Sequence, residues 1–397
     1  QNVAKRYLSS CKKSSIITTF ITVNVWLHKF MSKKINVLMM AAGTGGHVFP
    51  ALAVADEMVA RGGGIHWLGT PKGMENELVA KHGHTMHHID MQGLRGKGLV
   101  RAIKLPFMLF KAVMASKNII KNNNIDVVIG FGGYVTAPGG LAAKLCKIPL
   151  IIHEQNAIAG MSNKNLARHA DKVLQAFDGA FDSDGKKVLT VGNPVRQSIA
   201  NIAPPKERYL NDDSPLKVLV VGGSLGAKAI NEAVVELLKL SDKPLTVRHQ
   251  CGKDNHNTML VAYSQAQIDT SRHVFEVMPF IDDMAQAYSW ADVVICRAGA
   301  LTVTEIASVG VAAIFVPLPH AVDDHQTANA KSLTDKEAGI LLPQHELSGE
   351  TLAQILTGLD RQKCLDMAKK AQESAKHHVA KTVAELVLAY GDDKGSQ

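Results

Sequence analysis

Two halves of this 397-residue chain open in the same way, with a buried strand that runs into a glycine-rich turn and then into a helical segment. The turns read MAAGTGGH at residues 40–47 and VGGSLGA at residues 221–227. Around them, short runs rich in Val, Ile and Leu alternate with longer segments of helical periodicity, which predicts βαβ units and parallel sheets. Because one hydrophobic core seldom covers this length, we expect two Rossmann-like α/β domains that face each other across a cleft.

The order of the predicted elements also places the domain boundary. The clearest strands are predicted at residues 35–41, 65–68, 127–129, 150–153, 216–221, 245–249, 274–277, 293–296 and 312–316. Prolines and polar residues at 193–215 separate the two series. We therefore expect an N-terminal domain over residues 34–195, a C-terminal domain over residues 196–375, and a C-terminal helix over residues 376–397 that packs back on the N-terminal domain. Ligands of open parallel sheets bind beyond the carboxyl ends of the strands, so the cleft is the expected site.

Residues 1–33 differ from the rest and are interpreted as an N-terminal extension, with Met31 as a candidate start of the native protein. Residues 1–34 hold seven lysines and arginines and no acid, so without them the net charge of +8 falls to +1. A nearly neutral body without an aromatic-studded basic groove disfavours nucleic acid as a partner. The apolar stretch at residues 16–27 is too short to span a bilayer. It resembles the core of a signal peptide, but no clear cleavage site follows it.

Three glycine turns follow predicted strands, at residues 43–47, 130–134 and 222–226. Glycine lets backbone N–H groups approach an anion closely, and the N-terminus of a following helix adds partial positive charge. None of the turns matches G-x-G-x-x-G or contains G-K-[ST], which disfavours nicotinamide binding and excludes a Walker A loop. The alternative for any single turn is tight packing of a helix on a strand. We expect the first helix to start at Phe49 and Pro50, because proline suits the first helical turn.

Neither a cofactor nor a metal ion is expected. The five cysteines are scattered and never form a C-x-x-C pair, which argues against a disulfide framework and a structural zinc site. Asp182 and Asp184 have a D-x-D spacing that can hold a divalent ion, but Gly185 and Lys186 behind them favour a surface turn. The aspartate pairs at 282–283 and 323–324 are interpreted as helix caps.

Six motifs occur in an order that points to one family. They read GTGGHVFP at residues 43–50, GFGGY at 130–134, HEQN at 153–156, GNPVR at 192–196, GGSLGA at 222–227 and RAGALTVTE at 297–305. Together they closely resemble the motifs of the MurG family of bacterial enzymes, over a region from Lys34 to about Tyr390. The resemblance implies the GT-B fold, an α/β architecture of two Rossmann-like domains whose parallel sheets face each other across a cleft.

The same resemblance implies a reaction and its partners. It implies an inverting glycosyltransferase that moves GlcNAc from UDP-GlcNAc to the C4 hydroxyl of MurNAc in undecaprenyl-diphosphate-linked lipid I. The product, lipid II, serves peptidoglycan synthesis. An anionic membrane surface and other cell-wall synthesis proteins are further implied partners, at the cytoplasmic face of the bacterial inner membrane. In this family the C-terminal domain holds most of the donor, and the N-terminal domain meets the acceptor and the membrane.

The resemblance also implies a set of substrate-binding positions. They are Thr44, Gly45, Gly46, Asn156, Arg196, Ser224, Ile281, Ala300, Leu301, Thr302, Val303, Thr304, Glu305 and Gln326. Ser224 is implied as a diphosphate ligand, and a helix N-cap is its alternative role. Ala42 and Ala157 replace glycines that are usual in the family, and their methyl groups would narrow the site slightly.

Two of the polar positions carry the expected chemistry. The Glu305 carboxylate has two interpretations: it accepts both hydroxyls of a ribose, which the resemblance favours, or it closes a T-x-x-E capping box with Thr302. His47, at the rim of the first turn, is the candidate catalytic base because imidazole titrates near neutrality. A lone histidine is more often structural, and Glu154 or His153 are the alternatives that would assist catalysis or orient the acceptor.

A basic and apolar segment follows the first two predicted strands. Residues 91–125 contain no acid, and Arg101, Lys104, Phe107, Phe110 and Lys111 would form a rim that suits an anionic bilayer. Each cation near such a surface contributes about 1 kcal/mol. The alternative is an ordinary amphipathic helix packed on the sheet with a solvated basic face.

Two other functions stay open at this level. One is a different activity on the same fold, either a UDP-GlcNAc 2-epimerase or a glycolipid synthase that uses diacylglycerol. The other is a nucleotide-sugar sensor without catalysis. UDP release that depends on lipid I separates the transferase from both.

Overall fold

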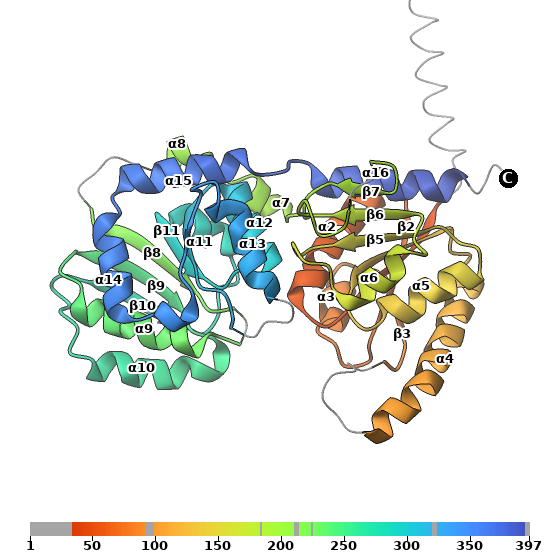
Figure 1. The fold of residues 1–397 in the computed structure, drawn as a ribbon, viewed down its shortest axis with the longest axis horizontal. Coiled ribbons are helices and arrows are strands. Elements are labelled where there is room, and N and C mark those ends of the chain that lie inside the picture. Colours follow the sequence, from red (N-terminus) through yellow and green to blue (C-terminus); the bar gives the residue numbers. More distant parts are fainter. Residues whose placement is uncertain are drawn as a thin grey trace, which may run out of the picture.

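The computed structural model describes residues 34–91, 99–182, 185–209, 214–223, 225–319 and 324–393, and residues 99–104 by their backbone alone. Within these ranges the chain forms two α/β domains that lie side by side (Figure 1). The predicted extension over residues 1–33 lies outside the described residues, as do Ser224, Asp184 and Asp323.

The first domain is built on a seven-stranded parallel sheet in the order β3-β2-β1-β4-β5-β6-β7. Its strands are β1 (Asn36–Ala41), β2 (Gly64–Gly69), β3 (Thr85–His88), β4 (Val127–Gly132), β5 (Leu150–Glu154), β6 (Lys172–Gln175) and β7 (Val188–Thr190). The central strands read as nearly continuous apolar runs because helices cover both faces of a parallel sheet.

Six helices of the described ranges cover this sheet. They are α2 (Gly45–Ala60), α3 (Glu75–Lys81), α4 (Leu99–Asn122), α5 (Thr136–Leu145), α6 (Met161–Ala167) and α16 (Val379–Asp392). Side chains of α4 and α5 pack on one face, around Leu38 and Val128. Side chains of α2 and α16 pack on the other face, around Val37 and Ile129. The last helix of the chain therefore completes the core of the first domain.

The second domain has a six-stranded parallel sheet in the order β10-β9-β8-β11-β12-β13. Its strands are β8 (Leu216–Val221), β9 (Leu245–Gln250), β10 (Val274–Met278), β11 (Val293–Cys296), β12 (Ala312–Phe315) and β13 (Ile340–Leu341). Its helices are α7 (Gln197–Ala200), α8 (Pro205–Arg208), α9 (Lys228–Leu240), α10 (His256–Gln265), α11 (Met284–Trp290), α12 (Ala300–Val309), α13 (His325–Thr334), α14 (Gly349–Gly358) and α15 (Arg361–Glu373). Helices α9 and α14 cover one face, and α11, α12 and α13 cover the other.

The chain crosses between the domains twice, once between β7 and α7 and once between α15 and α16 (Figure 1). A cavity of about 370 Å³ lies beside both crossings, because residues 192–193 and 374–376 line it together with residues of α12 and α13. The two domains are thus joined by a double connection rather than by a single linker.

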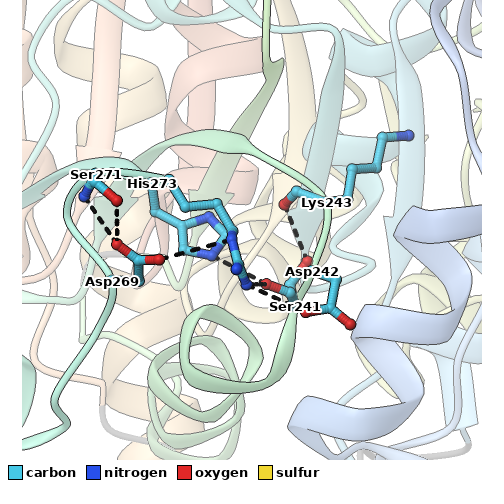
Figure 2. A network of polar contacts seen from close by, with 7 residues as sticks. Ser241, Asp242, Lys243, Asp269, Ser271 and His273 are labelled. Carbon is cyan, nitrogen blue, oxygen red and sulfur yellow. Dashed lines mark hydrogen bonds and ion pairs between the residues drawn. The ribbon is translucent and has the colours of Figure 1, made fainter.

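A polar network joins two loops at the amino ends of β9 and β10 (Figure 2). The His273 Nε2–H donates to the Ser241 carbonyl over 3.1 Å, and the Arg272 guanidinium donates to Asp242 over 3.2 Å. Asp269 accepts from the backbone N–H and the hydroxyl of Ser271. Because ligands bind at the carboxyl ends of such strands, this network stabilises the edge of the domain that lies away from the cleft.

Candidate active site

The carboxyl ends of both sheets carry the loops that face the cleft, and several contacts between described residues cross it. The Asn193 amide donates to the Thr304 hydroxyl over 3.1 Å, and the Asn329 Oδ1 accepts from the Ala157 N–H over 2.8 Å. The Arg196 guanidinium lies 5.1 Å from the centre of the Phe49 ring. The GT-B architecture expected from the sequence is confirmed.

The first glycine turn places a helix N-terminus at the cleft. Helix α2 begins at Gly45 with Thr44 as its N-cap, so the predicted start at Phe49 and Pro50 is wrong. Pro50 lies inside the helix, where it gives up one backbone hydrogen bond, because the glycines before it already adopt helical geometry. The N–H groups at the start of α2 have no partner within the helix, which makes Thr44, Gly45 and Gly46 suited to hold an anion.

Sequence reasoning missed Glu75, which holds this turn in place. Its side chain is fully buried, and one carboxylate oxygen accepts from the Thr70 N–H and hydroxyl over 2.9 and 2.8 Å. The other oxygen accepts from the Gly43 N–H over 3.3 Å. Gly43 has φ +98°, a conformation that favours glycine. The contact joins residues 32 positions apart, and no sequence pattern marks it.

His47 lies in the first turn of α2 and is half-buried. Its Nδ1 lies 3.0 Å from the Gln155 Oε1, so the HEQN motif meets the first glycine turn in space. Gly132, with φ +116°, passes so close that a Cβ there would lie 2.7 Å from Nδ1 of His47. Gln155 is therefore a second residue that sequence reasoning missed, although its motif was noted.

Glu154 and His153 are both buried and bonded inside the protein. The two Glu154 oxygens accept from the Asn156 N–H over 3.0 Å, the Gly160 N–H over 3.0 Å and the Asn163 amide over 2.9 Å. The His153 Nε2–H donates to the Gly192 carbonyl over 2.9 Å, and burial lowers the pKa of this imidazole to about 4. Their geometry supports positioning roles for both residues rather than contact with a substrate.

Glu305 forms a buried cluster with Arg196 and Tyr288. One carboxylate oxygen lies 3.1 Å from the Arg196 guanidinium, and the other accepts from the Tyr288 hydroxyl over 3.1 Å. Burial raises the pKa of Glu305, and the Arg196 charge acts in the opposite direction. Helix α12 begins at Ala300 with Gly299 as N-cap, so the capping box of Thr302 and Glu305 is not formed. The carboxylate instead lies in the second turn, beside a cation that can hold it ionised.

The remaining positions implied to bind the sugar nucleotide lie in α12 and at Gln326. Ala300 and Leu301 open α12 at the cleft, whereas the Val303 side chain packs in the core and the Thr304 hydroxyl donates to the Ala300 carbonyl over 2.9 Å. Gln326 lines an open hollow of about 500 Å³ beside the glycine turn after β8, and its Oε1 accepts from the Leu318 N–H over 2.9 Å.

Two predicted positions lie at the edges of this arrangement. Ile281, before α11, packs partly against the core of the second domain. The Asn156 Oδ1 accepts from the Asn329 amide of the other domain over 3.3 Å.

Helix α4 carries an exposed apolar face. Phe107 is 73% exposed and Phe110 is 63% exposed, and Lys111 lies beside them at the surface. The opposite face buries Ala112 and Val113 against the sheet. The side chains of Arg101 and Lys104 lie outside the described part of the chain. Among the described residues no helix is long and apolar enough to cross a bilayer.

One group of described side chains has metal-ligating chemistry, and it lies outside the cleft. The ligand atoms of Asp56, His82 and His84 lie within 4.8 Å of one another. Asp56 and His82 are exposed, and the Asp56 Oδ1 lies 3.0 Å from the His82 Nδ1, within hydrogen-bond distance.

Of the helix caps expected at residues 282–283, Asp283 caps α11, because its side chain accepts from the Gln286 N–H at the start of that helix.

Comparison with known proteins gives the same assignment for both domains. Residues 37–175 match the Glycosyltransferase family 28 N-terminal domain, and residues 217–386 match the Glycosyltransferase family 28 C-terminal domain. A protein of Psychrobacter arcticus is 61% identical over 355 residues, which are 89% of this chain and 98% of that protein. An Acinetobacter baumannii protein is 49% identical over 360 residues, 90% of this chain and 98% of that one. Both are named UDP-N-acetylglucosamine--N-acetylmuramyl-(pentapeptide) pyrophosphoryl-undecaprenol N-acetylglucosamine transferase.

Solved structures agree with these relatives. The crystal structure of Acinetobacter baumannii MurG has a TM-score of 0.78 at 46% identity and covers 89% of this chain and 99% of its own. A UDP-GlcNAc 2-epimerase from Neisseria meningitidis has a TM-score of 0.61 at 12% identity, over 90% of this chain and 100% of its own, which shows the shared fold alone. The chain therefore belongs to glycosyltransferase family 28 and, within it, to the MurG family.

Proposed function

We propose that this protein transfers GlcNAc from UDP-GlcNAc to the C4 hydroxyl of MurNAc in lipid I, with inversion, and so makes lipid II for peptidoglycan synthesis. The observation that carries the proposal is a contact across the cleft: the Arg196 guanidinium, which pairs with Glu305, lies 5.1 Å from the centre of the ring of Phe49, and Phe49 lies in α2, the helix that carries His47. The names of relatives at 61% and 49% identity over nearly their whole length support the same substrates.

The chemistry is a single displacement at the anomeric carbon. The His47 imidazole takes the proton of the acceptor C4 hydroxyl, whose oxygen forms the new glycosidic bond. The bond to the UDP oxygen breaks, and its electron pair leaves with the diphosphate. Backbone N–H groups at the helix N-termini and the Arg196 guanidinium stabilise this developing charge.

The roles that we propose on the donor side come from the resemblance to the MurG family. Glu305 binds the ribose hydroxyls of UDP, and Arg196 keeps the carboxylate charged in a buried position where burial alone would favour its neutral form. Thr44 and Asn156 contact the transferred sugar from the first domain. Glu154 acts as a positioning residue of the Asn156 loop, because its oxygens accept from the Asn156 and Gly160 N–H groups and from the Asn163 amide.

The acceptor reaches the cleft from a membrane. Phe107 and Phe110 lie one helical turn apart on an exposed face of α4, where apolar rings next to Lys111 suit the interface of an anionic bilayer. We place the protein at the cytoplasmic face of the bacterial inner membrane as a peripheral protein, with other cell-wall synthesis proteins as neighbours.

The test is an assay with UDP-GlcNAc and lipid I in detergent micelles. We expect release of UDP that depends on lipid I, together with formation of lipid II. Release without acceptor, or formation of UDP-ManNAc, would contradict the proposal. A His47→Ala variant should lose most of its turnover and keep its UDP-GlcNAc affinity, whereas near-normal turnover would remove His47 as the base.

A further inference from the structure

A buried chain of hydrogen bonds leads from His47 to the connection between the domains. The His47 Nδ1 lies 3.0 Å from Gln155 Oε1, the Gln155 Nε2 lies 3.2 Å from His153 Nδ1, and the His153 Nε2 lies 2.9 Å from the Gly192 carbonyl oxygen. His153 is fully buried and stacks on Phe131, with ring centroids 5.3 Å apart. Of the residues in this series of hydrogen bonds, only His47 reaches solvent. The protein interior therefore determines which atom donates and which accepts at each step.

The Gly192 carbonyl, at the far end of this series of hydrogen bonds, determines which ring nitrogen of His153 carries a hydrogen. A carbonyl oxygen only accepts, so the His153 Nε2 must carry a hydrogen. Burial lowers the pKa of His153 to about 4, so the imidazole is neutral near pH 7. Its Nδ1 is therefore a bare acceptor, and it takes a hydrogen bond from the Gln155 amide N–H.

The orientation of the Gln155 amide follows from a second contact. Its Nε2 also donates to the His153 backbone carbonyl over 3.0 Å. The reversed amide would place Oε1 against that carbonyl and against the bare His153 Nδ1, leaving three acceptors without a proton between them. The oxygen of Gln155 thus faces His47, where it can only accept.

We propose that Gln155 and His153 are positioning residues that hold His47 in its Nδ1–H tautomer and leave Nε2 with a free lone pair. This is the form that can take a proton from an acceptor hydroxyl. A neutral histidine side chain in water prefers the opposite, Nε2–H tautomer, so the hydrogen bonds from Gln155 and His153 select a minor form. A neutral amide orients the base without a neighbouring negative charge, unlike the aspartate of a Ser-His-Asp triad. The catalytic consequence rests on the proposed role of His47, whereas the tautomer does not.

The first test needs no variant. Two-bond ¹H–¹⁵N spectra of the full-length protein, labelled on histidine nitrogens, distinguish a protonated nitrogen from a bare one. The His47 signals are assigned by their loss in a His47→Gln variant. At neutral pH we expect a protonated Nδ1 and a bare Nε2. A protonated Nε2 with a bare Nδ1 in the wild-type protein would overturn the proposal.

The second test separates positioning from simple stability. Gln155→Met keeps the length of the side chain and removes its acceptor, and we expect mixed tautomers at His47, a fall in kcat of about tenfold or more and an unchanged KM for UDP-GlcNAc. Gln175→Met is the matched control, since Gln175 is also fully buried in this domain and bonds Thr190 and Phe181 instead. The Gln175→Met variant should show the same His47 spectrum and the same kcat as the wild-type protein.

The outcomes also separate this inference from the proposed function. If Gln155→Met keeps the wild-type His47 spectrum, the positioning role is wrong. If the wild-type protein shows the Nδ1–H pattern but His47→Gln turns over normally, the tautomer assignment holds and only the role of His47 as base is lost.

Discussion

At the scale of single residues, Glu305 gives a prediction that separates binding from capping. Replacing Glu305 by Ala leaves the Arg196 guanidinium and the Tyr288 hydroxyl without their buried acceptor. We expect the free energy of unfolding to fall by about 1–3 kcal/mol and the affinity for UDP to fall about tenfold or more, measured by urea denaturation and titration calorimetry. Tyr288→Phe is the control, because it removes one hydrogen bond to Glu305 and no expected ligand contact. Unchanged UDP affinity in Glu305→Ala would leave the carboxylate a purely structural role.

Two buried histidines predict how stability depends on pH. Burial lowers the pKa of both His153 and His249 to about 4, whereas an unfolded histidine titrates near 6.5. The unfolded state therefore binds more protons between these values, and stability falls as pH falls from about 6.5 to about 4. Each histidine should lower the free energy of unfolding by about 2 kcal/mol when the pH is lowered from 7 to 5.

His249 offers the cleaner measurement because it bonds Tyr263 and Asn231 and takes no part in the hydrogen bonds that lead to His47. Urea denaturation of His249→Gln at pH 7 and pH 5 should show a shallower loss than the wild-type protein. An equal loss in both proteins would mean that His249 does not titrate in this way.

At the scale of elements, α4 carries the prediction for the membrane. Serine at Phe107 and Phe110 should lower binding to anionic vesicles by at least tenfold, because two exposed rings lose their apolar contact with the interface. Lys111→Gln should weaken binding to anionic vesicles and leave binding to neutral vesicles unchanged. Leu260→Ser on α10, which is 46% exposed in the other domain, is the control. Vesicle sedimentation measures all of them, and equal binding of the double variant would remove α4 as the docking face.

The sequence was sufficient for the fully buried central strands and insufficient for most strands toward the sheet edges. The predictions at residues 216–221 and 293–296 coincide with β8 and β11, because both are almost entirely apolar. The strands β3, β6, β7 and β13 were not predicted, since they lie toward the edges of their sheets and contain at most two consecutive apolar residues. Pairing with a neighbour, rather than local sequence, specifies such strands.

The site shows the same division between local pattern and contact in space. Motifs pointed to His47, Arg196 and Glu305 before their arrangement was known. They could not reveal that Arg196 and Glu305 form a pair, because 109 positions separate these residues. Gln155 and Glu75 were missed for the same reason, since each acts through a partner that only the fold brings near.

At the scale of the whole molecule, Asn329 links the two domains. Its buried amide accepts from the Ala157 N–H and donates to Asn156, both in the first domain. Asn329→Ala should open the cleft and increase the radius of gyration in X-ray scattering, with turnover lowered about tenfold because each lost hydrogen bond costs about 1 kcal/mol. Ser332→Ala, one turn along α13, should change neither. An unchanged scattering profile for Asn329→Ala would show that other contacts hold the cleft closed.

The placement of α16 has a consequence for how the protein is made. Val383 and Val387 of this helix fill the core of the first domain, yet they are translated after the entire second domain. Domains generally fold in order as they leave the ribosome, at about 5–20 residues per second. Here the half that is synthesised first must wait about 10–40 seconds for its final helix. A nascent chain arrested before α16 should therefore expose an unfinished apolar surface, a natural substrate for chaperones, until its last residues emerge.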